Sequence, residues 1–392
     1  MNGVKFIRES GGLSRVLQGT DHVSGLIVYG EGAIEKTLIL SVDELSNKGI
    51  TTATNPVLHY HISEFFRINE GAKLYVQSVA ESDGNYTELK VLQNYSEGNI
   101  KQMGICDYKT TIANLSNRVS KLNTLATELG GSNTPLSILY SLKLTSEDML
   151  ALPNLHTLNA ERVSVVIAQD LLGRGGYLSS TKPSIGVMGA MLGAISKAKV
   201  HESIGWVEKQ NLVSTAYVKS FTADVEKARE LDGVGFCDGS AIGNYTPQQL
   251  QSIHDKGYIF CVKYPGRVGT YFNDSFTATS LDSDFAFIEN NRTIDKAQRE
   301  IEKVLLPKVS GPAYIDEDTG YLDASTVASL EALCDDAMDQ MVRDGEISGY
   351  KVYINPSQQI LRTSKLEVVI KIVPVGTMRE ITVKLNLTLK LN

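Results

Sequence analysis

The chain has 392 residues, of which 42% are hydrophobic and 21% charged, so it can build one large domain or two ordinary domains with real cores. Its formal net charge of −7 and its pI near 5.5 disfavour generic binding to nucleic acid or to an anionic membrane surface. Four widely spaced cysteines without a CxxC pair argue against a disulfide framework or a zinc site, and they are typical of reduced thiols in a protein made in the cytosol.

The first 20 residues indicate an arm rather than a domain. A short alternating piece around Val4 and Phe6 leads into the pair Gly11-Gly12. Charged residues stand where a signal peptide needs its apolar core, so we expect a protein made in the bacterial cytoplasm without a signal peptide. The most apolar helical stretch of the chain is too short and too rich in glycine to span a bilayer, which argues against direct membrane insertion.

Residues 21–270 alternate between strand and helix patterns, which predicts a larger, outer N-terminal α/β domain. A helix is predicted over residues 56–68, because Asn55 is a typical cap and Pro56 fits the first helical turn. Short apolar runs predict the strands of this domain at residues 25–29, 74–79, 163–168, 234–237 and 258–262.

Glycines mark two further helices of this domain. Apolar side chains recur in helical phase over residues 110–129, and the pair Gly130-Gly131 ends that pattern. In the other helix Gly186, Gly189 and Gly193 are spaced three and four residues apart. They therefore share one face, which lets another backbone approach closely.

The pattern changes near residue 270, where we place a domain boundary. A helix over residues 290–306 is followed by an acidic turn at 316–320 and by a longer helix over 324–343. Two predicted strands, 350–354 and 366–373, complete a compact core domain that spans residues 271–378.

The last twelve residues alternate without a break between aliphatic and polar side chains, and they define a C-terminal arm over residues 379–392. Period two is the pattern of a strand. Burying six aliphatic side chains gains no more than the entropy lost in ordering twelve residues, so this strand needs a sheet that already exists. The aliphatic side of this strand comprises Ile381, Val383, Leu385, Leu387, Leu389 and Leu391, and the alternation alone leaves open which sheet it joins.

Motifs for nucleotide binding are incomplete. Gly173 and Gly175 match the first two glycines of a dinucleotide loop, but Leu178 takes the third position, so we predict a surface turn from which no helix starts. A P-loop does not occur in the sequence. We therefore predict no cofactor site.

Metal and catalytic motifs fail in the same way. His201 and Glu202 begin like a zinc-protease helix, but position 205 is glycine. The turn that begins at Asp316 imitates a calcium loop, yet its twelfth position is Val327. We predict no catalytic or metal site, and the alternative is an enzyme of an unrecognised α/β class that uses His201 and Glu202 or the Asp316 turn.

One charge pattern distinguishes the helix over residues 290–306. Four basic residues at spacings of four, three and four form one stripe along it. The stripe is interpreted either as a solvated face or as a docking face for an acidic partner. The last 28 residues also carry more basic than acidic residues on an acidic chain, which favours encounter with the body of a neighbour.

Three long segments of the C-terminal third resemble the sheath subunits of contractile phage tails and related injection machines. Residues 284–307 resemble the inner helix of that family and its approach, and residues 314–359 resemble its turn, long helix and short strand ending in Asn-Pro. Residues 366–391 are similar to its closing strand, Pro-Val-Gly turn and terminal arm. Weaker similarity to one branch of the family extends to residues 189–207 and to the opening GVKFIRESGG.

The resemblance implies a structural protein and not an enzyme. Such subunits have a compact C-terminal α/β core and exchange their terminal arms, here through Val4, Phe6 and the six aliphatic residues of the C-terminal ladder. They polymerise helically around an inner tube, and the sheath contracts to drive the tube through a target envelope. The implied tube contacts are Arg292, Lys296, Arg299 and Lys303.

The same resemblance implies the partners and the location of the protein. The partners are further copies of the chain, the inner tail tube protein, and baseplate and tail terminator proteins; no cofactor and no nucleic acid is implied. The protein is expected in a virion tail or a contractile injection particle. Another tail or baseplate component is a further alternative, whereas a tube subunit is normally smaller and dominated by strands.

Overall fold

The structure is a computed structural model that describes residues 17, 19–181, 185–219 and 227–387. The chain divides after Leu306 into two compact units, which are described separately. Both units combine helices with strands, so the predicted α/β class is confirmed. The helix α8 (Ile288–Leu305) belongs to the first unit by this division. The functional domain limits expected near residues 20, 270 and 378 stay predictions.

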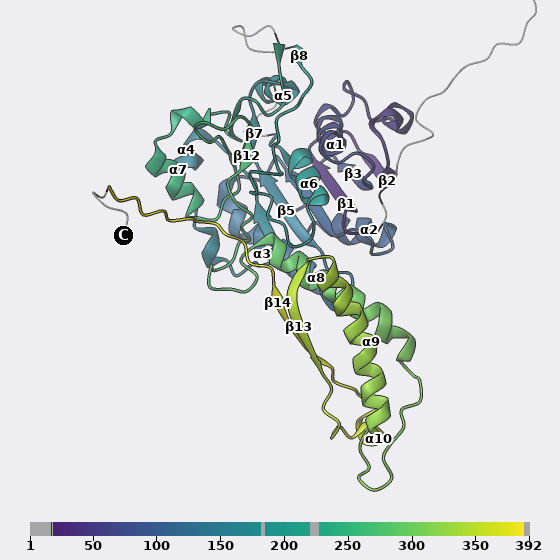
Figure 1. Ribbon diagram of the computed structural model, residues 1–392. Coiled ribbons are helices and arrows are strands. Elements are labelled where there is room, and N and C mark those ends of the chain that lie inside the picture. Colours follow the sequence, from purple (N-terminus) through teal and green to yellow (C-terminus); the bar gives the residue numbers. More distant parts are fainter. Residues whose placement is uncertain (1–16, 18, 182–184, 220–226, 388–392) are drawn as a thin grey trace, which may run out of the picture. The chain divides into compact units, whose positions relative to one another are not determined.

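A six-stranded sheet forms the centre of the first unit (Figure 1). Its order is β2-β3-β1-β4-β5-β6, and all neighbours pair in parallel except β2, which runs antiparallel to β3 at the edge. The strands β1, β4 and β5 are buried along their whole length, as expected where helices cover both faces of a parallel sheet. The strands are β1 (Ser24–Tyr29), β2 (Ile34–Ile39), β3 (Leu74–Val79), β4 (Gln102–Asp107), β5 (Ser137–Leu142) and β6 (Val163–Val165).

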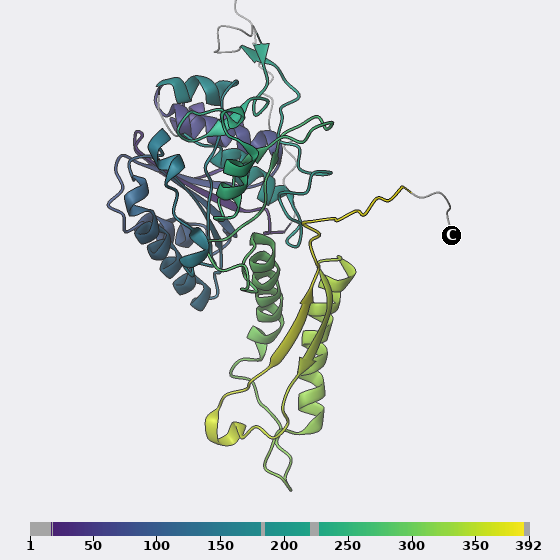
Figure 2. The same cartoon turned by 90° about the vertical axis from the view of Figure 1, so that its left-hand side faces the viewer.

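Right-handed crossovers place the helices on the two faces of this sheet. The chain moves from β1 to β3 through α1 (Pro56–Ile68) and then turns back across β1 to reach β4 through α2 (Thr87–Tyr95). The connection from β1 to β3 runs along the sheet in one direction, and the connections to β4 and β5 run in the other. Because all of them are right-handed, α1 lies on one face and α2 lies with α3 (Leu115–Gly131) on the other. Figure 2 shows the sheet between these layers. The helix α6 (Met188–Lys197) packs against α1 and over β4.

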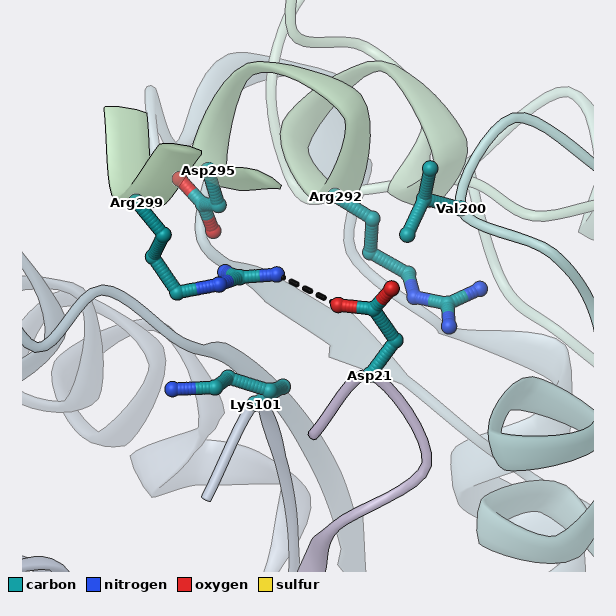
Figure 3. A pocket seen from close by; sticks show the side chains of 6 residues that line it. All are labelled: Asp21, Lys101, Val200, Arg292, Asp295 and Arg299. Atoms are coloured by element: carbon teal, nitrogen blue, oxygen red, sulfur yellow. Dashed lines mark hydrogen bonds and ion pairs between the residues drawn. The ribbon is translucent and has the colours of Figure 1, made fainter. Parts of the chain in front are cut away.

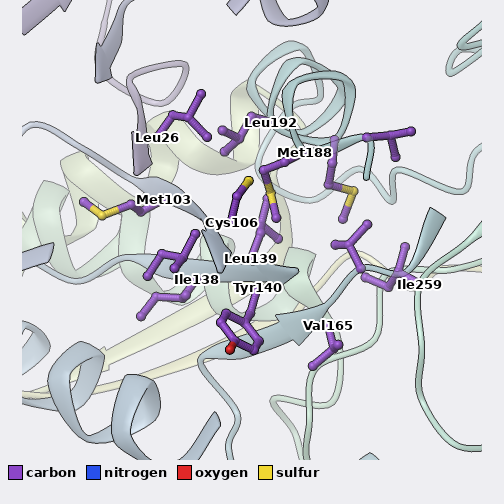
Figure 4. Close-up of a cluster of buried hydrophobic side chains, with 14 of the residues drawn as sticks. Leu26, Met103, Cys106, Ile138, Leu139, Tyr140, Val165, Met188, Leu192 and Ile259 are labelled. Atoms are coloured by element: carbon purple, nitrogen blue, oxygen red, sulfur yellow. The ribbon is translucent and has the colours of Figure 1, made fainter. Parts of the chain in front are cut away.

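The core is assembled from both layers and the sheet. Figure 4 shows the part of it in which the side chains of α6 lie over the strands. Met188 and Leu192 of α6 lie over β4, where a Cβ added at Gly104 would come within 2.7 Å of the Met188 side chain. The expected close backbone approach is confirmed at Gly189, because a Cβ there would lie 2.0 Å from the carbonyl oxygen of His61 in α1. Gly186 precedes α6 and has a φ of +65°, so it serves the turn and not the helix face.

Smaller pairs of strands and short helices complete the first unit. The strands form three antiparallel pairs: β7 (Ala168–Asp170) with β10 (Val234–Phe236), β8 (Val218–Lys219) with β9 (Lys227–Ala228), and β11 (Cys261–Val262) with β12 (Tyr271–Phe272). The helices are α4 (Ser146–Leu150), α5 (Arg174–Thr181) and α7 (Pro247–His254).

Four local predictions were wrong in this unit. The single strand expected over residues 163–168 is split, because β6 joins the large sheet and β7 pairs with β10. The helix expected from residue 110 begins at Leu115 after a 3₁₀ turn, and it continues through Gly131. The strand expected over residues 258–262 is reduced to Cys261 and Val262. A helix does start after Gly173, because α5 begins at Arg174.

The second unit is a long helix on a two-stranded hairpin. The helix α9 (Ala324–Arg343) matches its predicted bounds; the Asp323 carboxylate accepts a hydrogen bond from the Ser325 amide at 2.9 Å, and Gly345 follows with a φ of +72°. It packs against β13 (Ile347–Tyr353), which pairs antiparallel with β14 (Val369–Pro374) (Figures 1 and 2). The short helix α10 (Ile360–Thr363) lies in the connection between the two strands.

Candidate assembly site

The apolar ladder of the C-terminal arm is exposed over the part that the structure describes, residues 381–387. Residues 375–387 form no strand, and the exposed fractions of Ile381, Val383, Leu385 and Leu387 are 74, 69, 89 and 107%. Leu389 and Leu391 lie outside the described residues, as do Val4 and Phe6 of the N-terminal arm. A continuous exposed row of aliphatic side chains is unfavourable in water, which makes this segment a candidate interaction surface.

The hairpin of the second unit offers edges to which a strand could add. In the part of the chain that the structure describes, the sheet contains β13 and β14 alone, so each strand has one unpaired edge. Such an edge exposes a row of backbone donors and acceptors, which is a template for pairing with another chain. The hairpin therefore provides the kind of sheet that the terminal ladder needs.

The predicted tube-contact residues lie in two different environments. Arg292 is buried, and its guanidinium donates to the carbonyl oxygens of Lys199 at 3.1 Å and Ala198 at 3.2 Å. Lys296 and Arg299 also turn inward, because each forms an ion pair of 2.8 Å with Asp21. Lys303 pairs with a neighbour on its own helix, and its side chain is 65% exposed.

These inward-facing side chains belong to an ionic network that joins α8 to the amino ends of the strands. Asp21 precedes β1, Lys101 precedes β4, and Arg162 precedes β6. Arg162 forms a salt bridge of 2.6 Å with Asp295 of α8. The side chains surround a small polar pocket, lined by Asp21, Lys101, Val200, Arg292, Asp295 and Arg299 (Figure 3).

Positive charge exceeds negative charge around this pocket. The pKa values of Lys101 and Asp21 are both lowered. Burial lowers the pKa of Lys101 to about 8, with the Arg299 charge adding to the effect. Burial alone would raise the pKa of Asp21, but the charges of Lys296 and Arg299 outweigh it and hold that pKa below its usual value. The network therefore keeps Asp21 ionised and bound to α8.

The crevice where a fold of this topology often binds a ligand is filled by the chain's own side chains. With β3 and β4 on opposite sides of β1, the topological switch lies at the carboxyl end of β1. There the Glu31 carboxylate accepts the amides of Val57 and Leu58 at 3.0 and 2.9 Å, which are positions at a helix start where a phosphate could bind. Asn55, the expected cap, makes no side-chain cap and instead donates to the Gly32 carbonyl oxygen at 2.7 Å.

At the start of α5 a carboxylate of the chain likewise occupies the position where a ligand could bind. The Glu230 carboxylate accepts the amide and the guanidinium of Arg174 at 3.0 and 2.9 Å at the start of α5. Burial raises the pKa of Asp170 well above its usual value, and its contact with Glu230 adds to that rise. Two buried carboxyl groups in contact hold a proton between them. The glycines Gly173 and Gly175 fit closely around this pair and Tyr60.

Of the residues of the alternative enzymatic reading, Glu202 and Asp316 have structural partners, whereas the buried Nδ1 atom of His201 has no hydrogen-bond partner among the described residues. The Glu202 carboxylate accepts the Lys209 ammonium at 2.6 Å and the Lys199 amide at 3.1 Å. The Asp316 carboxylate accepts the Thr319 amide at 2.8 Å, which closes a tight turn. Among the residues that the structure describes, no three His, Cys, Asp or Glu side chains are grouped to hold a metal ion. Within the same residues, no helix combines the length and the hydropathy needed to cross a membrane.

Two family models cover nearly the whole chain. One, described as the DUF2586 N-terminal domain, matches residues 1–276, and the other, described as the DUF2586 C-terminal domain, matches residues 284–392. No curated protein matches the chain. A chain of the cryo-EM structure described as the anti-feeding prophage (AFP) baseplate, 6-fold symmetrised, has a similar fold, with a TM-score of 0.63, 15% sequence identity and coverage of 99% of both chains.

Proposed function

The chain belongs to the DUF2586 family, and from that membership and its fold we propose that it is a structural subunit of a contractile injection machine, and more specifically a sheath subunit. Copies of the chain polymerise helically around an inner tube, and contraction drives the tube through a target envelope. The likeness to a chain of the anti-feeding prophage baseplate over its full length supports a structural role in such a particle.

The exposed C-terminal arm is the observation that carries this proposal. Within the residues that the structure describes, its aliphatic side chains are exposed, and β13 and β14 each leave an edge unpaired. A strand added to such an edge is held by backbone hydrogen bonds, and its alternate side chains select the register. Because the tail of one copy meets the hairpin of another, the contact is heterologous and can grow into a helical row.

Electron microscopy of two matched arm variants tests this proposal. Replacing Val383, Leu385 and Leu387 by serine is expected to leave a folded protein that no longer forms tubes. The control replaces the polar positions of the same segment (Thr382→Ser, Lys384→Gln, Asn386→Ser) and is expected to retain assembly. Loss of folding in the first variant would show that the ladder belongs to its own subunit, and strand exchange would then be rejected.

The inner tube is the second proposed partner. The burial and ion pairs of the basic side chains on α8 reduce the number of predicted residues that can contact it. Arg292, Lys296 and Arg299 are engaged within the first unit, so of the four predicted residues Lys303 is the one whose charge faces solvent. Lys303→Glu is expected to weaken co-assembly with the tube protein at low salt and to leave sheath-only polymers intact. Co-assembly equal to that of the unmodified protein would reject a tube contact through Lys303.

A baseplate component is the competing structural role, because the similar chain comes from a baseplate structure with six-fold symmetry. Closed symmetric contacts stop growing, whereas a sheath contact leaves an open end. Negative-stain images of the purified protein separate the two roles. Striated tubes of variable length would support the sheath, and rings of one size that never elongate would support a baseplate component.

A further inference from the structure

The two strands of the hairpin divide their side chains between two faces. Tyr350 and Ile354 turn toward α9: the Tyr350 hydroxyl donates to the Asp335 carbonyl oxygen at 3.1 Å, and Ile354 is buried with Val327 of α9. Because side chains alternate along a strand, the intervening positions point away from α9. This outer face comprises Gly349, Lys351, Tyr353, Val369, Lys371 and Val373.

The outer face carries an apolar surface interrupted by two like charges. Tyr353, Val369 and Val373 are 51, 39 and 59% exposed, which is high for large hydrophobic side chains of a strand pair. Between them, Lys351 lies directly opposite Lys371 in the register, and both residues are exposed. Like charges opposite each other destabilise an antiparallel pair. The hairpin therefore has a place for an acidic partner.

The solvent side of α9 has the complementary features. Asp336 and Asp339 are both exposed and stand three residues apart, so they are neighbours on one helical face. Their Cβ atoms are expected about 5–6 Å apart, and those of an opposed cross-strand pair about 4.5–5.5 Å apart. The exposed side chains of Ala328 and Ala332 precede them on the helix and are small enough for large strand side chains to lie close.

We propose that α9 of one copy docks across the outer face of the β13–β14 hairpin of the next copy. Asp336 and Asp339 meet Lys351 and Lys371, while the exposed apolar side chains of the hairpin lie against the alanines of the helix. This second contact between copies rests on the proposed function, since it assumes that the chain assembles with itself. It joins different faces of the two copies, so it extends a row in the same sense as strand exchange.

The contact also gives a role to Lys351, Lys371 and Asp336, which are exposed in their own copy, and to Asp339, which also accepts the Tyr350 hydroxyl of its own copy. Complementary charges raise the rate of the correct encounter and disfavour other registers, because like charges brought together cost several kcal/mol. Strand exchange then supplies a lasting link, while the helix on the hairpin fixes how adjacent copies are oriented.

Charge exchange on the full-length chain tests the contact directly. The variant K351E/K371E and the variant D336K/D339N are each expected to fold and to lose tube formation. Asparagine at position 339 keeps an acceptor for the Tyr350 hydroxyl, which donates to Asp339 at 2.7 Å. The variant with all four changes restores opposite charges and is expected to form tubes again. R362E/K365E, which makes the same change in net charge as K351E/K371E at exposed positions beyond the hairpin faces, is the control for that variant and is expected to assemble normally.

Sedimentation measures the contact even where tubes are absent. On the arm variant with Val383, Leu385 and Leu387 changed to serine, self-association at low salt is expected to fall about tenfold or more when K351E/K371E is added, and to weaken in 1 M NaCl. Unchanged self-association would overturn the docking of α9. So would a four-change variant that folds, like the two double variants, but does not form tubes. Absence of tubes in the unmodified protein, with this association preserved, would instead reject the sheath role alone.

Discussion

Asp21 and Arg299 are separated by 278 residues in the sequence, and their side chains form an ion pair of 2.8 Å. Asp21 lies just before the first strand of the large sheet, and Arg299 lies in the last helix of the first unit. Lys296 binds the other oxygen of the same carboxylate at 2.8 Å. The pair therefore ties the segment just before β1 to the helix that precedes the second unit.

Removal of this carboxylate should destabilise the first unit. Asp21→Ala removes the group that both Lys296 and Arg299 bind. Because the Asp21 side chain is 34% exposed, the expected cost lies between that of an exposed and that of a buried ion pair, about 1–3 kcal/mol. Urea unfolding measures the change in the free energy of unfolding. Glu300→Ala, which removes the partner of the exposed Lys303, is the control and should cost less than about 1 kcal/mol. Equal effects in the two variants would mean that the Asp21 network is solvated.

The same network predicts a pH dependence. Because the pKa of Asp21 is lowered in the folded state, its contribution to stability is present above the unfolded pKa of about 3.9 and is lost as pH falls through the folded value. The stability difference between the unmodified protein and Asp21→Asn should be constant near neutral pH and shrink below about pH 4. A difference that persists unchanged at pH 2 would contradict the ion-pair explanation.

Contact between α1 and α6 depends on the absence of a side chain at Gly189. Gly189→Ala places a Cβ 2.0 Å from the His61 carbonyl oxygen, so the helices must separate, and overpacking of this kind typically costs about 1–3 kcal/mol or more. Gly130→Ala in α3 is the matched control, since no atom lies within 4 Å of its added Cβ. The control should gain about 0.5–1 kcal/mol from helix propensity. Thermal unfolding of both variants measures whether Gly189→Ala lowers the stability while Gly130→Ala raises it.

The buried pair of Asp170 and Glu230 should make the first unit sensitive to alkaline pH. The pKa of Asp170 is raised in the folded state by burial and by Glu230, so its contribution is complete below the unfolded pKa and declines as pH rises through the folded value. Asp170→Asn keeps a donor toward Glu230 and removes this titration. Unfolding in urea across a pH series should show a flatter profile for the variant, and parallel profiles would exclude a shared proton.

Glu31 should stabilise the start of α1 although it lies 25 residues before that helix. Its carboxylate accepts two amides there, so Glu31→Ala is expected to cost about 0.5–2 kcal/mol, the range of a lost helix cap. Glu35→Ala, at an exposed position of β2, is the control and should change the free energy of unfolding by less than about 0.5 kcal/mol. Similar losses in the two variants would show that Glu31 is not the cap.

Elements with a strong pattern of their own could be predicted from the sequence. The helix α9 and the strand β3 have their predicted bounds, because helical phase and a capping Asp323 define the first and an apolar run between polar turns defines the second. The central strands β4 and β5 were missed. Their sequences, QMGICD and SILYSL, mix polar and apolar residues without a period, and it is the covered position in the sheet that buries every residue.

The candidate site also has features that the sequence predicts and features that only the tertiary structure decides. The alternation in the C-terminal arm predicts by itself a strand that needs another sheet, since period two and aliphatic content are local properties of the chain. Helical spacing also determines that Arg292, Lys296, Arg299 and Lys303 share a stripe. Only the tertiary structure decides which of them face solvent, because Asp21 and the carbonyl groups at the end of α6 reach them from distant parts of the sequence. Ion pairs and burial depend on which distant segments the fold brings together, and the spacing of residues along one helix does not determine those contacts.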